Sequence, residues 1–100
     1  MINFEYMSHS ATETMNFAQK LATKLNAGDL IVLNGDLGSG KTKFTEGILK
    51  YFGLDSEISS PTFTIVNEYI EINFEKFEED DNYRLLKIKT FGYKYDSIFE

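Results

Sequence analysis

The chain has 100 residues and a net charge of −6, with 42% apolar and 26% charged residues. This length favours one small domain, and the absence of cysteine excludes a disulfide framework and a thiolate metal site. The acidic balance disfavours direct binding to a nucleic-acid backbone, because that affinity comes mainly from Lys and Arg.

The N-terminal region predicts a short strand followed by a helix. Residues 2–6 alternate between apolar and polar side chains, which is typical of a half-buried strand. Ser10 and Glu13 have the spacing of a capping box, in which each side chain accepts a hydrogen bond from the backbone amide of the other. The next residues place apolar side chains on one face at helical spacing: Ala11, Met15, Ala18, Leu21, Ala22 and Leu25. Residues 26–28 are expected to end this helix.

The most informative stretch is Gly35-Asp36-Leu37-Gly38-Ser39-Gly40-Lys41-Thr42, which satisfies the Walker A pattern of a P-loop. An unbroken apolar run, residues 30–33, precedes the loop and predicts a strand buried on both faces of a parallel sheet. Apolar residues at helical spacing follow the loop, and Gly53 is expected to end the helix over residues 41–52. A P-loop requires this order of strand, glycine loop and helix.

The residue types of the loop predict phosphate binding. Gly35, Gly38 and Gly40 are expected to adopt positive φ, so that successive N–H groups converge on an anion at the start of the helix. Lys41 adds a positive charge for the β- and γ-phosphates, and the Thr42 hydroxyl is placed to ligate Mg²⁺. The alternative is a glycine-rich turn that binds nothing.

Polar residues at the start of the first helix are further candidates. His9, the single histidine, either stacks on a nucleotide base or faces water. Thr12, Glu13 and Thr14 either lie beside a bound nucleotide or, in the case of Glu13, only cap the helix.

A second polar motif follows the P-loop helix. Ser60-Pro61-Thr62-Phe63 begins a loop that turns into a β-rich run ending near Tyr69. In a P-loop protein, a threonine such as Thr62 is well placed to sense the γ-phosphate through Mg²⁺, as switch segments do. The alternative is a Ser/Thr turn that starts a strand.

The P-loop, the segment of residues 60–63 and Asn67-Glu68-Tyr69 together resemble the TsaE (YjeE) family of bacterial P-loop ATPases, and Thr12-Glu13-Thr14 is similar as well. The resemblance covers residues 1–70. It implies a role in making N6-threonylcarbamoyladenosine at position 37 of tRNA. It also implies ATP hydrolysis beside TsaB and TsaD proteins, which carry out the transfer.

Matching positions in this family imply roles for individual residues. Lys41 and Thr62 take part in catalysis, Thr42 ligates Mg²⁺, and Thr12 contacts the nucleotide. The residues that cradle phosphate are Gly35, Asp36, Leu37, Gly38, Ser39, Gly40 and Lys41.

The second half departs from the family. Its members carry a His-x-Asp-x-Tyr-Arg-Leu motif and an apolar strand ending in Glu-Trp, whose glutamate holds Mg²⁺, and this chain has no tryptophan. Residues 79–85 are either a degraded copy of that motif, with Asp81 as the acid, or part of a C-terminal hairpin. The hairpin, with strands over residues 72–77 and 83–91 and an acidic turn over residues 78–82, is favoured because both runs are β-rich. An internal segment of the family domain is then missing.

These observations predict a single P-loop domain over residues 1–100, with an α/β three-layer fold, a central, mostly parallel sheet and a C-terminal β-hairpin and tail over residues 71–100. The expected function is that of an ATP- and Mg²⁺-binding TsaE-like subunit, and hydrolysis stays open because the acid is missing. The alternatives are a non-hydrolysing interaction module and a small P-loop kinase. Expected partners are TsaB- and TsaD-like proteins, with tRNA reached only through the complex. Without a long apolar stretch or a signal-peptide pattern, we expect a cytoplasmic protein with no membrane contact.

Overall fold

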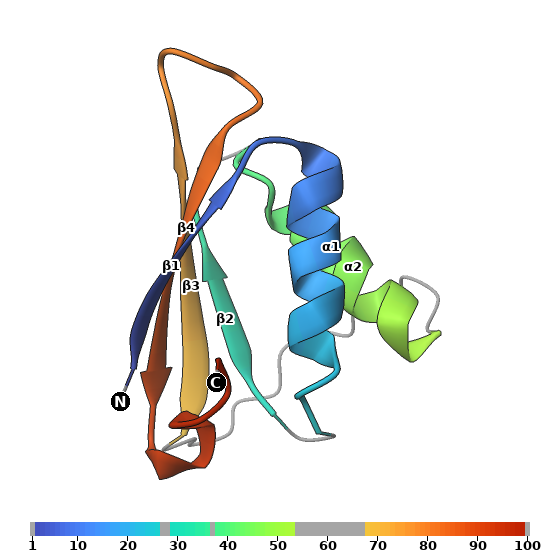
Figure 1. Cartoon of the computed structure of the whole chain (residues 1–100), viewed down its shortest axis with the longest axis vertical. Helices are drawn as coiled ribbons and strands as arrows, with labels where there is room; N and C mark the ends of the chain where they lie inside the picture. Colours follow the sequence, from blue (N-terminus) through green and yellow to red (C-terminus); the bar gives the residue numbers. More distant parts are fainter. Residues whose placement is uncertain (1, 27–28, 37, 54–67, 100) are drawn as a thin grey trace.

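A four-stranded sheet covered by two helices forms the structure, a computed structural model that describes residues 2–26, 29–36, 38–53 and 68–99. In chain order the elements are β1 (Asn3–Ser8), α1 (Ala11–Ala22), β2 (Ile31–Asn34), α2 (Lys41–Phe52), β3 (Tyr69–Lys76), β4 (Arg84–Phe91) and the 3₁₀ turn η1 (Tyr93–Tyr95). The strand order is β1-β4-β3-β2, and both helices lie on the same face of the sheet (Figure 1). The described residues therefore form two layers, not the three predicted. Neither described helix is long and apolar enough to span a membrane.

Three strands, β1, β2 and β3, have their carboxyl ends on the same side of the sheet. β2 pairs in parallel with β3, whereas β4 pairs antiparallel with both β3 and β1. Hence β1, β2 and β3 run in one direction, and the pairing within the described sheet is mixed, because the antiparallel β4 lies between β1 and β3. The connection from β2 to β3 contains α2, as a parallel pair requires, while β3 returns directly through a turn.

β3 and β4 form the predicted C-terminal hairpin, which confirms the favoured interpretation of residues 71–91. The register places Tyr69 opposite Phe91 and Lys76 opposite Arg84, with the acidic turn between the strands. Residues 84 and 85 belong to β4, so residues 79–85 do not form the separate motif that the other interpretation required. Asp81 is an exposed residue of the turn.

Alternation along the strands separates a buried face from a polar one. On β3, Ile70, Ile72 and Phe74 are buried against the helices, while a Glu75 carboxylate on the other face pairs with Lys87 at 2.9 Å. The core residues are Ala18, Leu21, Phe44, Ile70, Ile72, Phe74, Leu86, Ile88, Tyr95 and Ile98. The expectation that the strand before the P-loop is buried on both faces is wrong for the described residues. β2 is an edge strand there, and residues 31–33 are only half-buried.

The start of α1 is capped, although not by a reciprocal box. The Glu13 amide donates to Ser10 Oγ at 3.1 Å, as predicted. The Glu13 carboxylate, however, accepts the backbone amide of His9 at 2.7 Å instead of that of Ser10, and it also bonds the His9 ring. These two bonds lower the pKa of Glu13. The helix ends at Ala22, three residues before the last residue of the predicted apolar face.

The two helices cross in close contact at a glycine. A Cβ atom added to Gly47 of α2 would lie 2.6 Å from the Met15 carbonyl oxygen and 2.7 Å from the Ala18 Cβ atom of α1. Gly47 and Ala18 are both buried. The small residues at this crossing therefore set the spacing between the helices.

The close crossing of the helices predicts that Gly47→Ala lowers the free energy of unfolding. In an unconstrained helix, Gly47→Ala would stabilise by roughly 1 kcal/mol through helix propensity. Here the added methyl group must displace backbone atoms, so we expect a net destabilisation of about 1–3 kcal/mol. Urea unfolding measures the difference, with the exposed Lys50→Ala in the same helix as the control. A stabilised Gly47→Ala variant would refute the close crossing.

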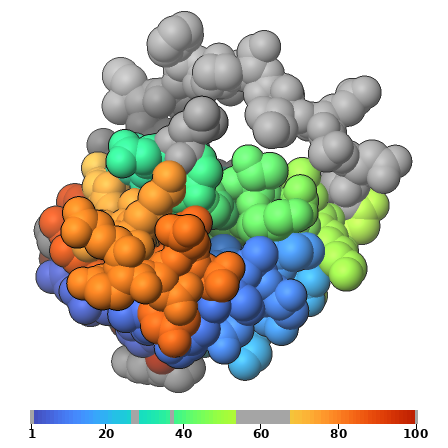
Figure 2. Space-filling model, turned by 90° about the horizontal axis from the view of Figure 1, so that it is seen from above, coloured from blue at the N-terminus to red at the C-terminus, as the bar shows by residue number. Residues whose placement is uncertain are grey.

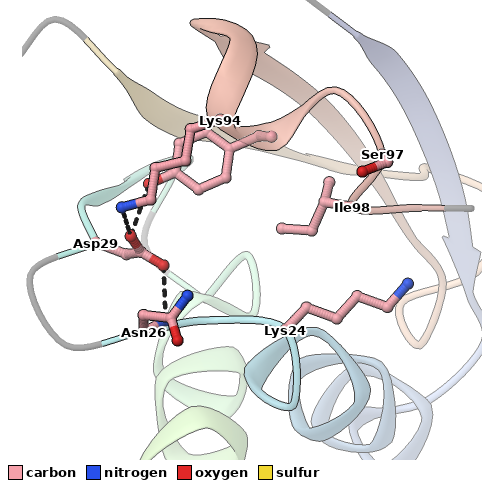
Figure 3. Close-up of a pocket in the computed structure, with 7 residues that line it drawn as sticks. Lys24, Asn26, Asp29, Lys94, Ser97 and Ile98 are labelled. Atoms are coloured by element: carbon pink, nitrogen blue, oxygen red, sulfur yellow. Dashed lines mark hydrogen bonds and ion pairs between the residues drawn. The ribbon is translucent and has the colours of Figure 1, made fainter.

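A carboxylate fastens the C-terminal tail to the loop before β2. Asp29, whose side chain is only 3% exposed, accepts hydrogen bonds from the Asn26 amide at 2.7 Å, the Tyr95 hydroxyl at 3.1 Å and the Lys94 ammonium group (Figure 3). These groups border a cavity of about 330 Å³. Farther along the tail, Phe99 stacks on Phe4 with ring centroids 4.4 Å apart. The tail therefore packs on the domain.

This contact predicts a pH-dependent stability. Burial raises the pKa of Asp29, but hydrogen bonds from Asn26, Lys94 and Tyr95 outweigh that effect, and the net pKa is lowered. A pKa that is lower in the folded state contributes stability that is present above the ordinary carboxyl pKa, near 4, and is lost as the pH falls through the folded value.

We therefore expect Asp29→Asn to cost about 1–3 kcal/mol at pH 7 and progressively less below about pH 4. Urea midpoints measured from pH 7 to pH 2 test this, with Glu46→Gln on the exposed face of α2 as the control. A cost that does not change with pH would contradict the assignment.

Candidate phosphate-binding site

The turn from β2 into α2 has the backbone of a phosphate-binding loop. Gly38 and Gly40 have φ of 78° and 106°, in the region that favours glycine, as predicted. Gly35 does not have positive φ, so that part of the prediction is wrong. Glycine is required at this position because a Cβ atom would lie 2.5 Å from Ser39 Oγ and 3.0 Å from Phe74 Cβ.

The N-terminus of α2 is left open. Its N-cap residue, Gly40, makes no side-chain capping bond, and the first intrahelical bond runs from the Phe44 amide to the Gly40 carbonyl at 3.0 Å. The amides of residues 41–43 therefore have no acceptor within the helix. In α1, by contrast, the Ser10 side chain accepts the amide of Glu13. An open N-terminus of this kind attracts an anion, through its amides and through the helix dipole.

Residues 38–42 of the predicted phosphate and magnesium site line one cavity at this end of α2, whereas Gly35 and Asp36 do not border it. It has a volume of about 220 Å³ and is bordered by residues 38–43. Lys41 is half-buried there, while Thr42 is exposed. A lysine ammonium group and a threonine hydroxyl beside free amides fit a polyphosphate with a Mg²⁺ ion bound to it. In the described ranges, no three His, Asp or Glu side chains cluster closely enough to hold a metal.

A second cavity adjoins the loop on the side of α1. Its volume is about 150 Å³, and it lies where the start of α1, the P-loop and the β3–β4 turn meet. Its lining residues are Ser10, Ala11, Thr14, Gly38, Gly40, Lys43, Asp81, Asn82 and Arg84. These three segments lie together in the view from above (Figure 2).

The structure places the other predicted residues as follows. Thr12 is exposed and does not border the second cavity, whereas Thr14 does, and its buried hydroxyl bonds Ser8 Oγ at 2.6 Å. Asp36 is exposed, and its carbonyl accepts the Ser39 amide at 3.0 Å. Leu37 and the segment that contains Thr62 lie outside the described residues.

His9 faces solvent, and its ring contacts the start of α1 and the hairpin turn. It bonds the Glu13 carboxylate at 2.9 Å and packs edge-on against Tyr83, with ring centroids 4.9 Å apart.

Sequence reasoning missed the contribution of the hairpin to this site. The Arg84 guanidinium group donates to the Gly38 carbonyl at 3.1 Å, and Lys76 Nζ would lie 3.5 Å from a Cβ atom on Gly38. One signal was present: Arg84 is the only arginine of the chain. Its place beside the loop follows from the parallel pairing of β2 and β3, which the sequence pattern did not specify.

Two buried polar atoms without a hydrogen-bond partner among the described residues lie at the P-loop and its contact with the hairpin. In the described part of the chain, the buried side-chain atoms that lack a hydrogen-bond partner are Ser39 Oγ and Arg84 Nε. Buried polar groups are normally paired, so unpaired ones call for an explanation. Both atoms belong to residues of the loop or its direct contacts.

Comparison with known proteins assigns the chain to a family. The model of the threonylcarbamoyl adenosine biosynthesis protein TsaE matches residues 8–99. A TsaE protein of Rickettsia typhi is 40% identical over 93 residues, which are 92% of this chain and 62% of that protein. A TsaE protein of Borreliella burgdorferi is 42% identical over 82 residues, which are 82% of this chain and 58% of that one.

A third TsaE protein, from Synechocystis, is 45% identical over 69 residues, 69% of this chain and 44% of the relative. The chain thus spans about half the length of the curated relatives it matches. The crystal structure of YdiB from Bacillus subtilis superposes with a TM-score of 0.82, covering 97% of this chain and 91% of YdiB at 18% identity. The likeness to YdiB confirms the fold.

Proposed function

The chain belongs to the TsaE family, and from that premise we propose that it binds ATP with Mg²⁺ at the loop of residues 35–42. In this role it supports the transfer of the threonylcarbamoyl group to adenosine 37 of tRNA. The observation that carries the proposal is the open N-terminus of α2, whose amides adjoin the cavity that Lys41 and Thr42 line.

Each part of the site has a role in this proposal. The amides at the start of α2 hold the phosphate oxygens, and Lys41 adds a mobile positive charge for the terminal phosphates. The Thr42 hydroxyl ligates Mg²⁺, which, when bound, neutralises charge on the phosphates. Thr62 is proposed as the switch residue, and Thr12 as a nucleotide contact.

The partners proposed for the chain are proteins. A net charge of −6 opposes contact with a phosphate backbone, so tRNA is reached through TsaB- and TsaD-like proteins in a shared complex. In this proposal, the ATP bound by this chain would change the state of the complex that the chain forms with the TsaB- and TsaD-like proteins.

A binding-only role is the second candidate, and one observation favours it. The cavity at the start of α2 is lined by residues 38–43, which include no Asp or Glu. Phosphoryl transfer needs a group that orients the attacking water and a magnesium ion held on more than one side. Only the Lys41 and Thr42 side of such a site is present in that lining.

We expect Lys41→Ala to weaken ATP binding in the presence of Mg²⁺ by about 30-fold or more, because a charge-assisted phosphate contact is lost. Calorimetric titration measures both affinities. Lys50→Ala, in the last turn of the same helix, removes the same charge far from the cavity and should bind ATP like the wild type. Equal affinities for the wild type and Lys41→Ala would contradict the assignment of this site.

The second expectation concerns turnover. This chain should bind ATP but hydrolyse it far more slowly than the longer relative from Rickettsia typhi, with or without TsaB- and TsaD-like proteins. Phosphate release by the two proteins, assayed side by side at saturating ATP, decides between an ATPase and a binding subunit. Comparable rates would show that an acid outside the lining of the cavity completes the site.

A further inference from the structure

Arg84, the only arginine, lies where the hairpin turn meets the P-loop. It is the first residue of β4, and the register places it opposite Lys76, the last residue of β3. Because β3 runs parallel to β2, this end of the hairpin lies at the edge of the sheet where β2 passes into the loop (Figure 1).

The guanidinium group holds backbone carbonyls from both segments at once. One terminal nitrogen, Nη2, donates to the Gly38 carbonyl of the loop at 3.1 Å. The other, Nη1, donates to the Tyr83 carbonyl at 2.7 Å and to the Asp81 carbonyl, both in the turn. A planar fork of donors spans the two segments, which a lysine ammonium group on a flexible stem does less well.

This contact fixes a peptide group of the loop from both ends. The carbonyl of the Gly38–Ser39 peptide accepts from Arg84, and the amide of the same planar unit donates to the Asp36 carbonyl at 3.0 Å. The stem of Arg84 also packs on the loop, since its Cγ atom lies 3.9 Å from the position of a Cβ atom on Gly40. This peptide group orients the amides that follow it, which are those at the N-terminus of α2.

The charge of Arg84 suits a place beside an anion site. Among the residues that the structure describes, no ion pair joins Arg84 to a carboxylate, and its Nε atom is buried without a partner. Its partners in the described ranges are neutral carbonyls, so the guanidinium group keeps its positive potential, which favours a phosphate in the adjoining cavity.

We propose that Arg84 is a positioning residue, which holds the P-loop in its phosphate-binding conformation by joining the Gly38 carbonyl to the β3–β4 turn. This inference rests on the proposed function, since the loop is taken to bind the phosphates of ATP. It adds that the hairpin turn is part of the binding apparatus. Loop amides serve the phosphates that ATP and ADP share, so Arg84 acts on the affinity for both nucleotides and not on the choice between them.

The test compares Arg84→Ala, Arg84→Lys and the wild type, with Lys89→Ala as the control. Lys89 is an exposed cation on the same strand that does not border either cavity at the loop. Calorimetry measures the affinity for ADP and for ATP, each with Mg²⁺. NMR follows the amide resonances of Gly38, Ser39 and Gly40 in the nucleotide-free proteins, with Ile72 and Ile88 as core references.

We expect Arg84→Ala to lose about 10-fold in affinity for both nucleotides, Arg84→Lys to recover part of the loss, and Lys89→Ala to lose nothing. The three loop amides should shift or broaden in Arg84→Ala while the core amides stay in place. Unchanged loop amides would overturn the proposal, even if the affinity falls, and so would a loss confined to ATP. If Arg84→Ala does not fold, the same readouts on Arg84→Lys decide.

If the proposed function fails, the experiments give other results than those that would overturn the role of Arg84. A wild type that binds neither nucleotide, or Lys41→Ala that binds both normally, contradicts the site itself, while the loop amides of the free protein still report whether Arg84 positions the loop.

Discussion

Parallel pairing between β2 and β3 determines where the rest of the site lies. It sets the carboxyl ends of both strands at one edge of the sheet, so the P-loop leaves β2 beside the point where β3 turns into β4. Because β1 has the same direction, the start of α1 arrives at this edge as well. Three segments that are distant in sequence thereby line the second cavity, next to the one that residues 38–43 line, at the usual location of ligands in open α/β sheets.

The two helices differ in whether a side chain of the protein caps their N-terminal amides. α1 begins with a serine that accepts an amide of its own helix, and the neighbouring Glu13 and His9 complete a local network. α2 begins with a glycine in the left-handed conformation, which satisfies none of its own amides. Both helices have twelve residues and pack on the same sheet, so the difference lies in the residues at their starts. An uncapped helix end is less stable by itself, and an anion supplies the missing acceptor.

Local patterns predicted much of this molecule, because they depend on contacts within a few residues. The strand, loop and helix around Lys41, the Ser10 cap and the hairpin of residues 71–91 were all accessible in this way. The errors concern contacts between distant segments. Gly35 is required by Phe74 of the neighbouring strand as well as by Ser39 of the loop, and the half-buried state of β2 follows from its place at the edge of the described sheet. Arg84 reaches the loop only because β3 pairs with β2. Neither periodicity nor motif spacing carries that information.

The position of β4 also determines the order in which the sheet can be completed. β1 is the first of the four described strands, but its partner is β4, the last of them, with Asn3 opposite Lys89. On a ribosome, β1 must therefore wait until β4 has been synthesised, while the contact between α1 and α2 joins segments that emerge earlier. Pairing over such a distance in sequence slows folding, because the loop must be closed before the pairing stabilises it. The pairing of β1 with β4 is thus a late step in the closure of the core.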